Sequence, residues 1–254
     1  MVQLTGRVLA DARRWDESCS ALLAVGWIDG RRHEGRTELV LRPCPTPPLQ
    51  GWRVRVEGVL RRPSSGPHPL LSGSAERLAV QGSWSRLTTS RLELLARRWT
   101  PIADLRRRIA IRFLDLAGVE RGGLLAALVL GSAQVQLPSD LRQIFRVAGL
   151  SHALAASGFH LSVLIGAALM LSRRWTAPFR LGLAFMAMLM FLLLAGSQPS
   201  VVRAVLMVSM ALLIRETGHR PRGFGVLLVA TSLMLLLHPA WARSIGFQLS
   251  AAAV

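Results

Sequence analysis

Two histidines, together with Ser151 and Ser157, lie inside an apolar segment that has no charged residue. Ser151, His152, Ser157 and His160 belong to residues 148–171, where most other side chains are aliphatic or small. A helix crosses the apolar core of a bilayer with about 20 apolar residues, so the length of this segment predicts a membrane span. Polar groups at that depth face the protein interior or a water-filled path, because hydrocarbon offers them no hydrogen bonds. Two interpretations stay open: the polar residues line a passage, or they join neighbouring helices.

The spacing places the polar residues on one side of an ideal helix. His152, Ser157 and His160 share an arc with small residues, which suits a pore or a close helix neighbour. Alternatively, Ser157 and Gly158 interrupt the helix and free backbone carbonyls at membrane depth. A metal site is not favoured, because neither a nearby carboxylate nor a Cys-x-x-Cys pattern accompanies the histidines. We therefore expect no metal and no cofactor.

Polar residues also stand at the start of two later apolar runs. Pro199 and Ser200 begin one run, and Arg203 lies about one turn inside it. A charged residue inside a span costs about 2.5–3.5 kcal/mol on insertion scales unless it snorkels or is paired. Arg203 is therefore predicted either to reach back to the membrane surface or to contact an anion in a channel. Gln248 and Ser250 begin the other run, close to the last residue of the chain.

Composition separates a basic soluble part from an apolar part. The chain of 254 residues has a net charge of +17, is 51% apolar and has a mean hydropathy of +0.39. Residues 142–254 contain ten arginines and one acid, Glu216, whereas the acids otherwise lie before residue 142. Every basic residue is arginine, which favours bidentate phosphate recognition or reflects a GC-rich coding bias. The charge predicts anionic partners, either phospholipid headgroups or nucleic acid.

Short alternating segments predict an all-β domain over residues 1–85. Five strands with turn-rich connections and a basic character favour a small barrel resembling an OB-fold, which is a common platform for single-stranded DNA. Trp52, Arg53 and Arg55 are therefore candidate DNA-binding residues. For Trp15 and Trp27 two interpretations stay open: their rings stack on bases, or they belong to the core or to an interface. The expected strands are 2–9, 20–28, 37–42, 52–60 and 75–80.

A helical period follows the strands and leads into a bundle of spans. Residues 86–121 are predicted to form amphipathic linker helices divided at Pro101, which lie on a membrane surface or pack on the barrel. Residues 122–131 are predicted to be a short buried or re-entrant helix. Residues 122–254 then read as a polytopic transmembrane domain that is truncated at its C-terminus. Its expected spans are 148–171, 176–195, 199–214 and 223–238, with another beginning near 246.

The loop charges predict an orientation for these spans. Arginines concentrate in loops 172–180 and 215–222, and the loop 196–200 has none, so the two arginine loops are expected in the cytoplasm. The β domain then lies outside the cytoplasm, although no signal peptide follows Met1. In that compartment a disulfide between Cys19 and Cys44 becomes possible.

Three segments, taken in order, point to a known family. The sequences AGLSHALAASGFHLSVL, PSVVRAVLM and HPAWARSIGFQLSAAAV closely resemble the membrane core of the ComEC family of competence proteins, where the patterns run roughly GLSHLLAISGLHV, PSVVRA and DPxxxxSxGFQLS. The resemblance covers approximately residues 105–254, and the N-terminal strands look like the extracellular OB-like domain of the family. The residues at the motif positions are Ser151, His152, Ser157, Gly158, His160, Pro199, Ser200, Arg203, Gly246, Phe247, Gln248 and Ser250.

The resemblance implies a function and a set of partners. Members of this family form a channel that passes single-stranded DNA across the bacterial inner membrane in natural transformation. The implied partners are single-stranded DNA, membrane lipid, a DNA receptor and a cytoplasmic DNA translocase. No catalytic residue is expected in this chain, so transport itself is not enzymatic.

The chain also departs from the family pattern. Full-length members usually begin with membrane helices, and many end in a metallo-β-lactamase-like domain with an HxHxDH motif, whereas the six histidines here include no HxH pair. We therefore interpret the chain as a fragment. Two alternatives stay open: a membrane-anchored metal-dependent hydrolase or nuclease whose catalytic domain lies beyond Val254, and a transporter of another anion.

Overall fold

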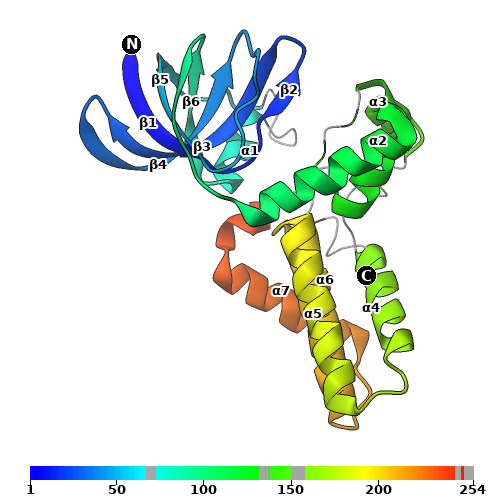
Figure 1. Ribbon diagram of the computed structural model, residues 1–254. Helices are drawn as coiled ribbons and strands as arrows, with labels where there is room; N and C mark the ends of the chain where they lie inside the picture. The colour runs from blue at the N-terminus through cyan, green and yellow to red at the C-terminus, as the bar shows by residue number, and fades with distance from the viewer. Residues whose placement is uncertain are drawn as a thin grey trace. The chain divides into compact units, whose positions relative to one another are not determined.

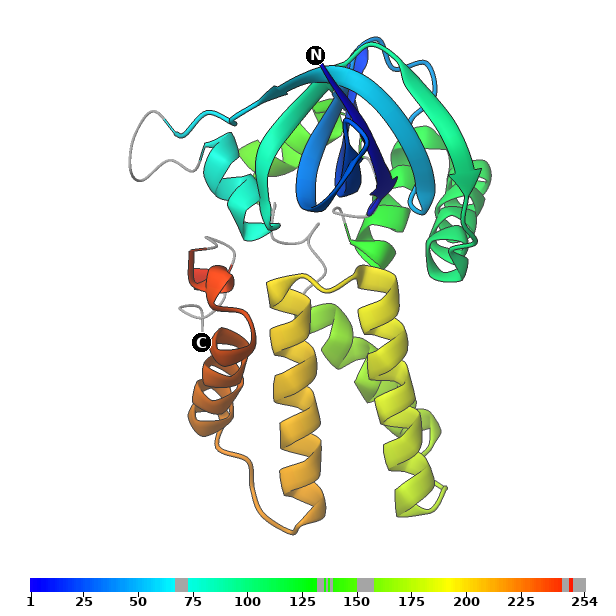
Figure 2. The same cartoon turned by 90° about the vertical axis from the view of Figure 1, so that its left-hand side faces the viewer.

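Strands fill the N-terminal part of the chain, and helices fill the rest (Figures 1 and 2). The structure is a computed structural model that describes residues 1–66, 73–131, 135, 137, 139–149, 158–243, 247 and 248. The chain divides into two units, Met1–Ala103 and Asp104–Val254. The predicted order of a sheet-rich region followed by helices is therefore confirmed.

The described residues up to Arg97 form seven strands and one short helix. The helix α1 (Ser74–Val80) lies between β5 and β6 in the sequence. The strands are β1 (Val2–Val8), β2 (Arg13–Trp15), β3 (Ser18–Ile28), β4 (Arg31–Leu41), β5 (Trp52–Arg61), β6 (Ser83–Thr89) and β7 (Leu92–Arg97).

The strand pairings form a ring that begins and ends at β1. β1 pairs with β3, and β3 pairs with β4, both antiparallel. β4 pairs with β6 in parallel, β6 pairs with β5, and β5 pairs with β1. β2 and β7 are added beside β3 and β5. The backbones approach closely where β5 meets β6, since a Cβ added to Gly58 would lie 2.3 Å from the carbonyl oxygen of Thr88.

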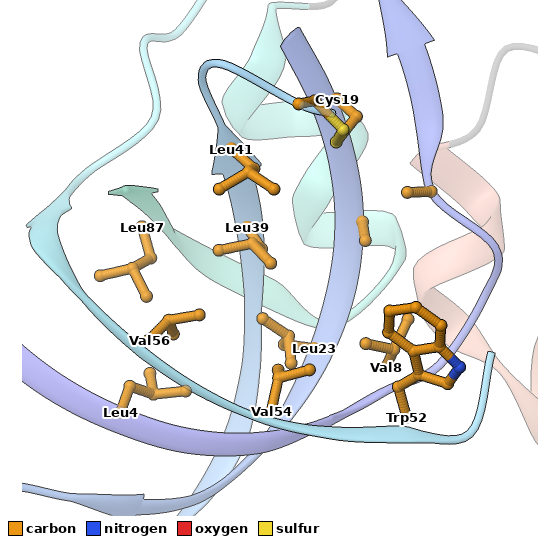
Figure 3. Packing of buried hydrophobic residues seen from close by; sticks show 13 residues of the cluster. Leu4, Val8, Cys19, Leu23, Leu39, Leu41, Trp52, Val54, Val56 and Leu87 are labelled. Carbon is orange, nitrogen blue, oxygen red and sulfur yellow. A yellow bond between two sulfur atoms is a disulfide. The ribbon is translucent and has the colours of Figure 1, made fainter. Parts of the chain in front are cut away.

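Alternation along the strands fills one hydrophobic core (Figure 3). On β5, Val54 and Val56 are buried and Arg53 and Arg55 are exposed, because successive side chains point to opposite faces of a sheet. The disulfide between Cys19 and Cys44 joins β3 to the loop after β4, and its two Cα atoms are 5.7 Å apart. The fully buried residues of this core include Leu4, Val8, Leu23, Leu39, Val54, Val56 and Leu87.

Two predicted elements of the first unit are wrong. The sequence predicts a strand over residues 75–80, but these residues belong to helix α1, whose Ala, Glu, Arg and Leu residues are good helix formers. The predicted helix after Arg86 is also wrong up to residue 97, where β6 and β7 form instead. Leu92 and Leu94 alternate with more exposed neighbours and pair with β5, so the period is two and not 3.6. The sheet therefore extends beyond the predicted limit at residue 85.

The elements that the structure describes in the second unit are helices. Helix α2 contains a break at Gly118 (φ 78°, ψ 176°), so the predicted short helix 122–131 forms its second part. Helices α5, α6 and α7 fall on the expected segments 176–195, 199–214 and 223–238. The helices are α2 (Pro101–Leu130), α3 (Ser139–Val147), α4 (Gly158–Leu171), α5 (Ala177–Ala195), α6 (Pro199–Glu216), α7 (Gly223–Leu237) and the 3₁₀ helix η2 (Pro239–Arg243).

Hydropathy distinguishes one of these helices from the others. Among the described residues, α5 is the one helix that is long and apolar enough to cross a membrane, with a mean hydropathy of 2.0. Helices α4 and α7 are apolar but shorter. Residues 150–157 of the first expected span lie outside the described residues, as do most residues of the span expected near 246.

Candidate functional site

Helices α4, α5 and α6 pack around a shared apolar core. Leu161 and Ile165 of α4 meet Met188 and Phe191 of α5 and Val201 of α6, and all five are buried. α5 and α6 are joined by the short turn 196–198, in which Gly196 has a φ of 84° that favours glycine. The two helices therefore run antiparallel, and the C-terminal end of α5 lies beside the N-terminal end of α6 (Figure 2).

Two of the family motif segments meet where α4 and α6 begin. A Cβ added to Gly158, the first residue of α4, would lie 3.6 Å from the Cβ of Ala204 on α6. This is an ordinary van der Waals distance, so the helices approach as closely as a small residue allows. Gly158 lies two residues before the motif residue His160, and Ala204 directly follows the motif residue Arg203. The contact of Gly158 with Ala204 therefore brings the two motifs together.

Two donor groups at the start of α6 are buried. One guanidinium nitrogen of Arg203, Nη1, and the side-chain amide nitrogen of Gln198 are both inaccessible to solvent, and within the described residues neither has a hydrogen-bond partner. Arg203 as a whole is half-buried. The buried nitrogen turns part of the guanidinium towards the protein, which favours the predicted anion contact over snorkelling. Pro199 takes the first position of α6, where its missing N–H costs no hydrogen bond.

The remaining motif residues have mixed outcomes. The half-buried imidazole of His160 packs edge-on against Phe159, with ring centroids 5.9 Å apart. Phe247 is buried, and the amide of Gln248 donates a hydrogen bond of 2.9 Å to the carbonyl oxygen of Ala242. Gln248 therefore holds η2, and its place at the mouth of a span stays a prediction. Ser200 is half-buried. The motif residues outside the described residues are Ser151, His152, Ser157, Gly246 and Ser250.

The two ends of the helix bundle differ in chemistry. The starts of α4 and α6, the turn before α6 and the 3₁₀ helix η2 lie at one end in both views (Figures 1 and 2). The turns 172–176 and 217–222 lie at the other end, which carries arginines. There Arg180 of α5 pairs with Glu216 of α6 at 3.8 Å. The motif residues that the structure describes thus gather at the end opposite the arginine-rich turns.

Sequence reasoning missed one residue that connects elements. The guanidinium of Arg106 on α2 donates hydrogen bonds to the carbonyl oxygen of Leu193 near the end of α5, the one from Nε measuring 3.1 Å. The amphipathic pattern of 86–121 has many arginines and contains no signal that separates Arg106 from the rest. The hydrogen bond becomes visible only when α2 and α5 are placed together.

The candidate DNA-binding residues of the first unit lie in different surroundings. Trp52 is 9% exposed, and the guanidinium of Arg97 lies 5.2 Å from the centre of its ring, so Trp52 belongs to the core. Arg55 forms an exposed ion pair with Glu93 at 3.4 Å. Arg53 is exposed and stands opposite Arg7 on the neighbouring strand β1. The tryptophans that are accessible for stacking are Trp15, Trp27, Trp84 and Trp99.

Trp52 and Arg55 contribute to a groove of about 710 Å³. The loop after β4 forms one wall with Pro43 and Pro45, and β7 forms the other with Leu92 and Leu94. Trp52 belongs to the lining, which also includes two arginines and two glutamates. Where the chain is described, no group of three or more His, Cys, Asp or Glu residues is placed to hold a metal ion.

Comparison with known protein families identifies the chain. Residues 128–254, half of the chain, match the family of competence proteins, named Competence. The chain therefore belongs to this family, and the predicted resemblance to ComEC-type competence proteins is confirmed. Comparisons with curated proteins and with solved structures found no match. Membership supports a role in competence and DNA uptake.

Proposed function

We propose that the chain is a component of an inner-membrane channel that takes up single-stranded DNA in natural transformation. Family membership supports the role in DNA uptake. The channel itself is inferred from the helix bundle, in which Arg203 and Gln198 carry buried donor nitrogens at the start of α6 and Ala204, next to Arg203 in the sequence, contacts the start of α4. Donors without an acceptor suit a strand whose phosphates supply acceptor oxygens. This arrangement is the observation that carries the proposal.

The outer surface of the bundle supports its place in a membrane. Side chains such as Met186 and Leu189 on α5 and Leu228 and Leu236 on α7 are each at least half exposed. Exposed apolar area costs about 25 cal/mol per Å² in water, and this cost disappears in lipid. Only 17% of the most apolar window of α5 is buried, which is unlike the core helix of a soluble protein. We therefore place α4 to α7 in the bilayer.

The arginine-rich turns orient the bundle in this proposal. By the positive-inside rule, turns 172–176 and 217–222 face the cytoplasm, and the end with the motif residues faces outwards. The β unit then lies outside, where a disulfide between Cys19 and Cys44 is chemically stable. DNA thus meets the motif residues before it reaches the arginines.

The pairing order of the first unit supports an OB-like barrel. β1, β3, β4, β6 and β5 pair in a ring, with a parallel contact between β4 and β6. A partly open Greek-key barrel of five strands is the OB architecture, which binds single strands in a basic groove with aromatic stacking. We propose that exposed arginines, including Arg53, and exposed tryptophans gather DNA on this barrel.

Transport by this chain is proposed to be non-enzymatic. No catalytic centre is invoked, and a cytoplasmic translocase supplies the energy for movement. The chain provides binding of phosphates and part of the lining of a polar path. A DNA receptor outside the membrane and the translocase inside it are the expected protein partners.

The test is DNA uptake by cells in which the gene for the whole protein carries Arg203→Ala or Arg203→Lys. Arg203→Ala should abolish uptake, and Arg203→Lys should restore part of it because the charge remains. Arg112→Ala, which removes an exposed arginine from α2, is the matched control and should leave uptake unchanged. Protein level and membrane fraction are measured in every strain. Normal uptake by Arg203→Ala at a normal membrane level would contradict the channel role of this residue.

A further inference from the structure

The cytoplasmic end of the bundle, in the orientation proposed above, carries a dense positive surface. Residues 171–180 and 215–223 together contain six arginines and one acid. We call this surface the arginine end, and five of its six arginines are exposed. Its arginines are Arg173, Arg174, Arg180, Arg215, Arg220 and Arg222. Only Arg180 reaches the single acid, Glu216, so most of this charge is not neutralised within the described residues.

The turn that presents Arg173 and Arg174 is held in place. The buried hydroxyl of Ser172 donates a hydrogen bond of 2.6 Å to the carbonyl oxygen of Ala168, and the N–H of Trp175 donates one of 2.9 Å to the carbonyl oxygen of Ser172. These two hydrogen bonds fix the conformation of the turn. Neither Arg173 nor Arg174 forms an ion pair in the described part of the chain, so both guanidinium groups are free to take an external anion.

Apolar side chains lie directly next to these charges. Met170 and Leu171, the last residues of α4, are 72% and 77% exposed, and Phe179 on α5 is 60% exposed. The Trp175 ring packs edge-on against Phe179, with centroids 4.5 Å apart. Exposed apolar groups beside guanidinium groups match a ligand that has an acyl chain and a phosphate. Single-stranded DNA offers phosphates without the acyl chain, and it would leave Met170 and Leu171 in water.

We propose that the arginine end is a binding site for anionic phospholipid, with the phosphate held by Arg173 and Arg174 and the acyl chains against Met170, Leu171 and Phe179. Guanidinium binds phosphate with two parallel hydrogen bonds, which the fixed turn favours. Trp175 sits at the level of the headgroups, where aromatic residues gather in membrane proteins. The site rests on the proposed membrane location of the bundle and assigns a ligand in addition to DNA.

The experiment measures lipid that is retained by the full chain purified in detergent. Phosphatidylglycerol and phosphatidylcholine are added in equal amounts, and native mass spectrometry counts the lipids bound to each protein molecule. The wild-type chain should prefer phosphatidylglycerol. The double variant Arg173→Gln/Arg174→Gln should lose about 30-fold in affinity for it, since each basic residue near an anionic surface contributes about fivefold. The variant Arg173→Lys/Arg174→Lys should lose less, because the charge is kept.

The matched control is Arg61→Gln/Arg62→Gln, which removes two adjacent exposed arginines from the β unit with the same change in charge. It should retain phosphatidylglycerol as the wild type does. Equal retention by both double variants would overturn the site, and so would an absence of preference between the two lipids. A loss of binding to a single-stranded oligonucleotide, with lipid retention unchanged, would overturn it in favour of DNA. Binding in detergent does not depend on the orientation of the spans.

Failure of the membrane proposal is recognised separately. Extraction of cell membranes with alkaline carbonate should leave the wild-type chain in the pellet. If the chain is released, the membrane location is wrong and the lipid site fails with it. If the chain stays in the pellet and shows no preference for phosphatidylglycerol, only the lipid site is wrong.

Discussion

The guanidinium of Arg106 donates hydrogen bonds to the carbonyl oxygen of Leu193, two residues before α5 ends at Ala195. The last carbonyls of a helix have no intrahelical N–H partner and need an external donor. Here the amide of Gly196 bonds to Leu192, and Arg106 serves the next carbonyl. A cation at this position also complements the negative end of the helix dipole. Arg106 therefore fixes α2 to the helix bundle.

Replacement of Arg106 by alanine should loosen α2 from the bundle. The change leaves the carbonyl of Leu193 without its charged donor, which costs about 1.5–3 kcal/mol of stability. Limited proteolysis of the purified chain should then cut α2 at lower protease concentration than in the wild type. Arg108→Ala, on an exposed position of the same helix, is the control and should resist like the wild type. Identical protection of the two variants would show that the hydrogen bond carries no stability.

The contact between Gly158 and Ala204 leads to a prediction about size. Gly158→Ala should be tolerated, because its Cβ meets the Cβ of Ala204 at 3.6 Å. Gly158→Leu should overpack the contact and cost about 1–3 kcal/mol, measured by thermal unfolding in detergent. The matched control is Gly166→Leu on the same helix, where no atom lies within 4 Å of an added Cβ.

A compensating change separates this contact from a general intolerance of leucine at the start of α4. Ala204→Gly removes the methyl group that faces Gly158, so the double variant Gly158→Leu/Ala204→Gly should recover part of the lost stability. Strict additivity of the two changes would mean that the helices are further apart than the structure places them.

The disulfide between Cys19 and Cys44 should stabilise the β unit. It closes a loop with a sequence separation of 25, which corresponds to about 3.5 kcal/mol in the chain-entropy relation. Both cysteines are also buried in the core, so reduction places two thiol groups in a packed interior. Urea unfolding followed by tryptophan fluorescence should show a lower midpoint for Cys19→Ser/Cys44→Ser. Reductant should lower the midpoint of the wild type and leave that of the double variant unchanged.

The apolar helices could be predicted from the sequence because their limits are set locally. Thr176 and Pro178 begin α5, and the segment from Gly196 to Pro199 separates it from α6, so both helices begin and end at residues that break or start helices. The three family motifs were also readable, because they depend on residue type and spacing alone. Both kinds of information lie within a few consecutive residues.

The errors in the β unit have a different physical origin. The segment from Arg86 to Arg97 has apolar residues that fit a helix as well as a strand, and its pairing with β4 and β5 decides the outcome. Such pairing joins residues far apart in the chain, so a local window does not contain it. The same holds for the site: the burial of Arg203 and the contact of Gly158 with Ala204 arise only from helix packing.

Two tryptophans of the β unit lead to different predictions, one for DNA binding and the other for stability. Trp52 is 9% exposed and lies in the core, whereas Trp27 is 48% exposed and stands opposite Arg32 on β4. A base can stack on the ring of Trp27 while Arg32 contacts the adjacent phosphate, which is how single strands bind without sequence preference. Trp52 has one ring face near Arg97 and packs within the core.

Trp27→Ala should therefore weaken binding of a single-stranded oligonucleotide by about tenfold, as expected for the loss of one stacked base. Unfolding of this variant should stay close to that of the wild type, and Trp27→Phe should keep most of the affinity because a ring remains. Trp52→Ala should instead destabilise the β unit by about 3–5 kcal/mol, the usual cost of truncating a buried aromatic residue.

Fluorescence anisotropy at two salt concentrations measures the affinity, which should fall as salt rises, since arginines replace counterions on the phosphates. Unchanged affinity for Trp27→Ala, together with binding that is insensitive to salt, would exclude this strand face as the DNA-binding surface.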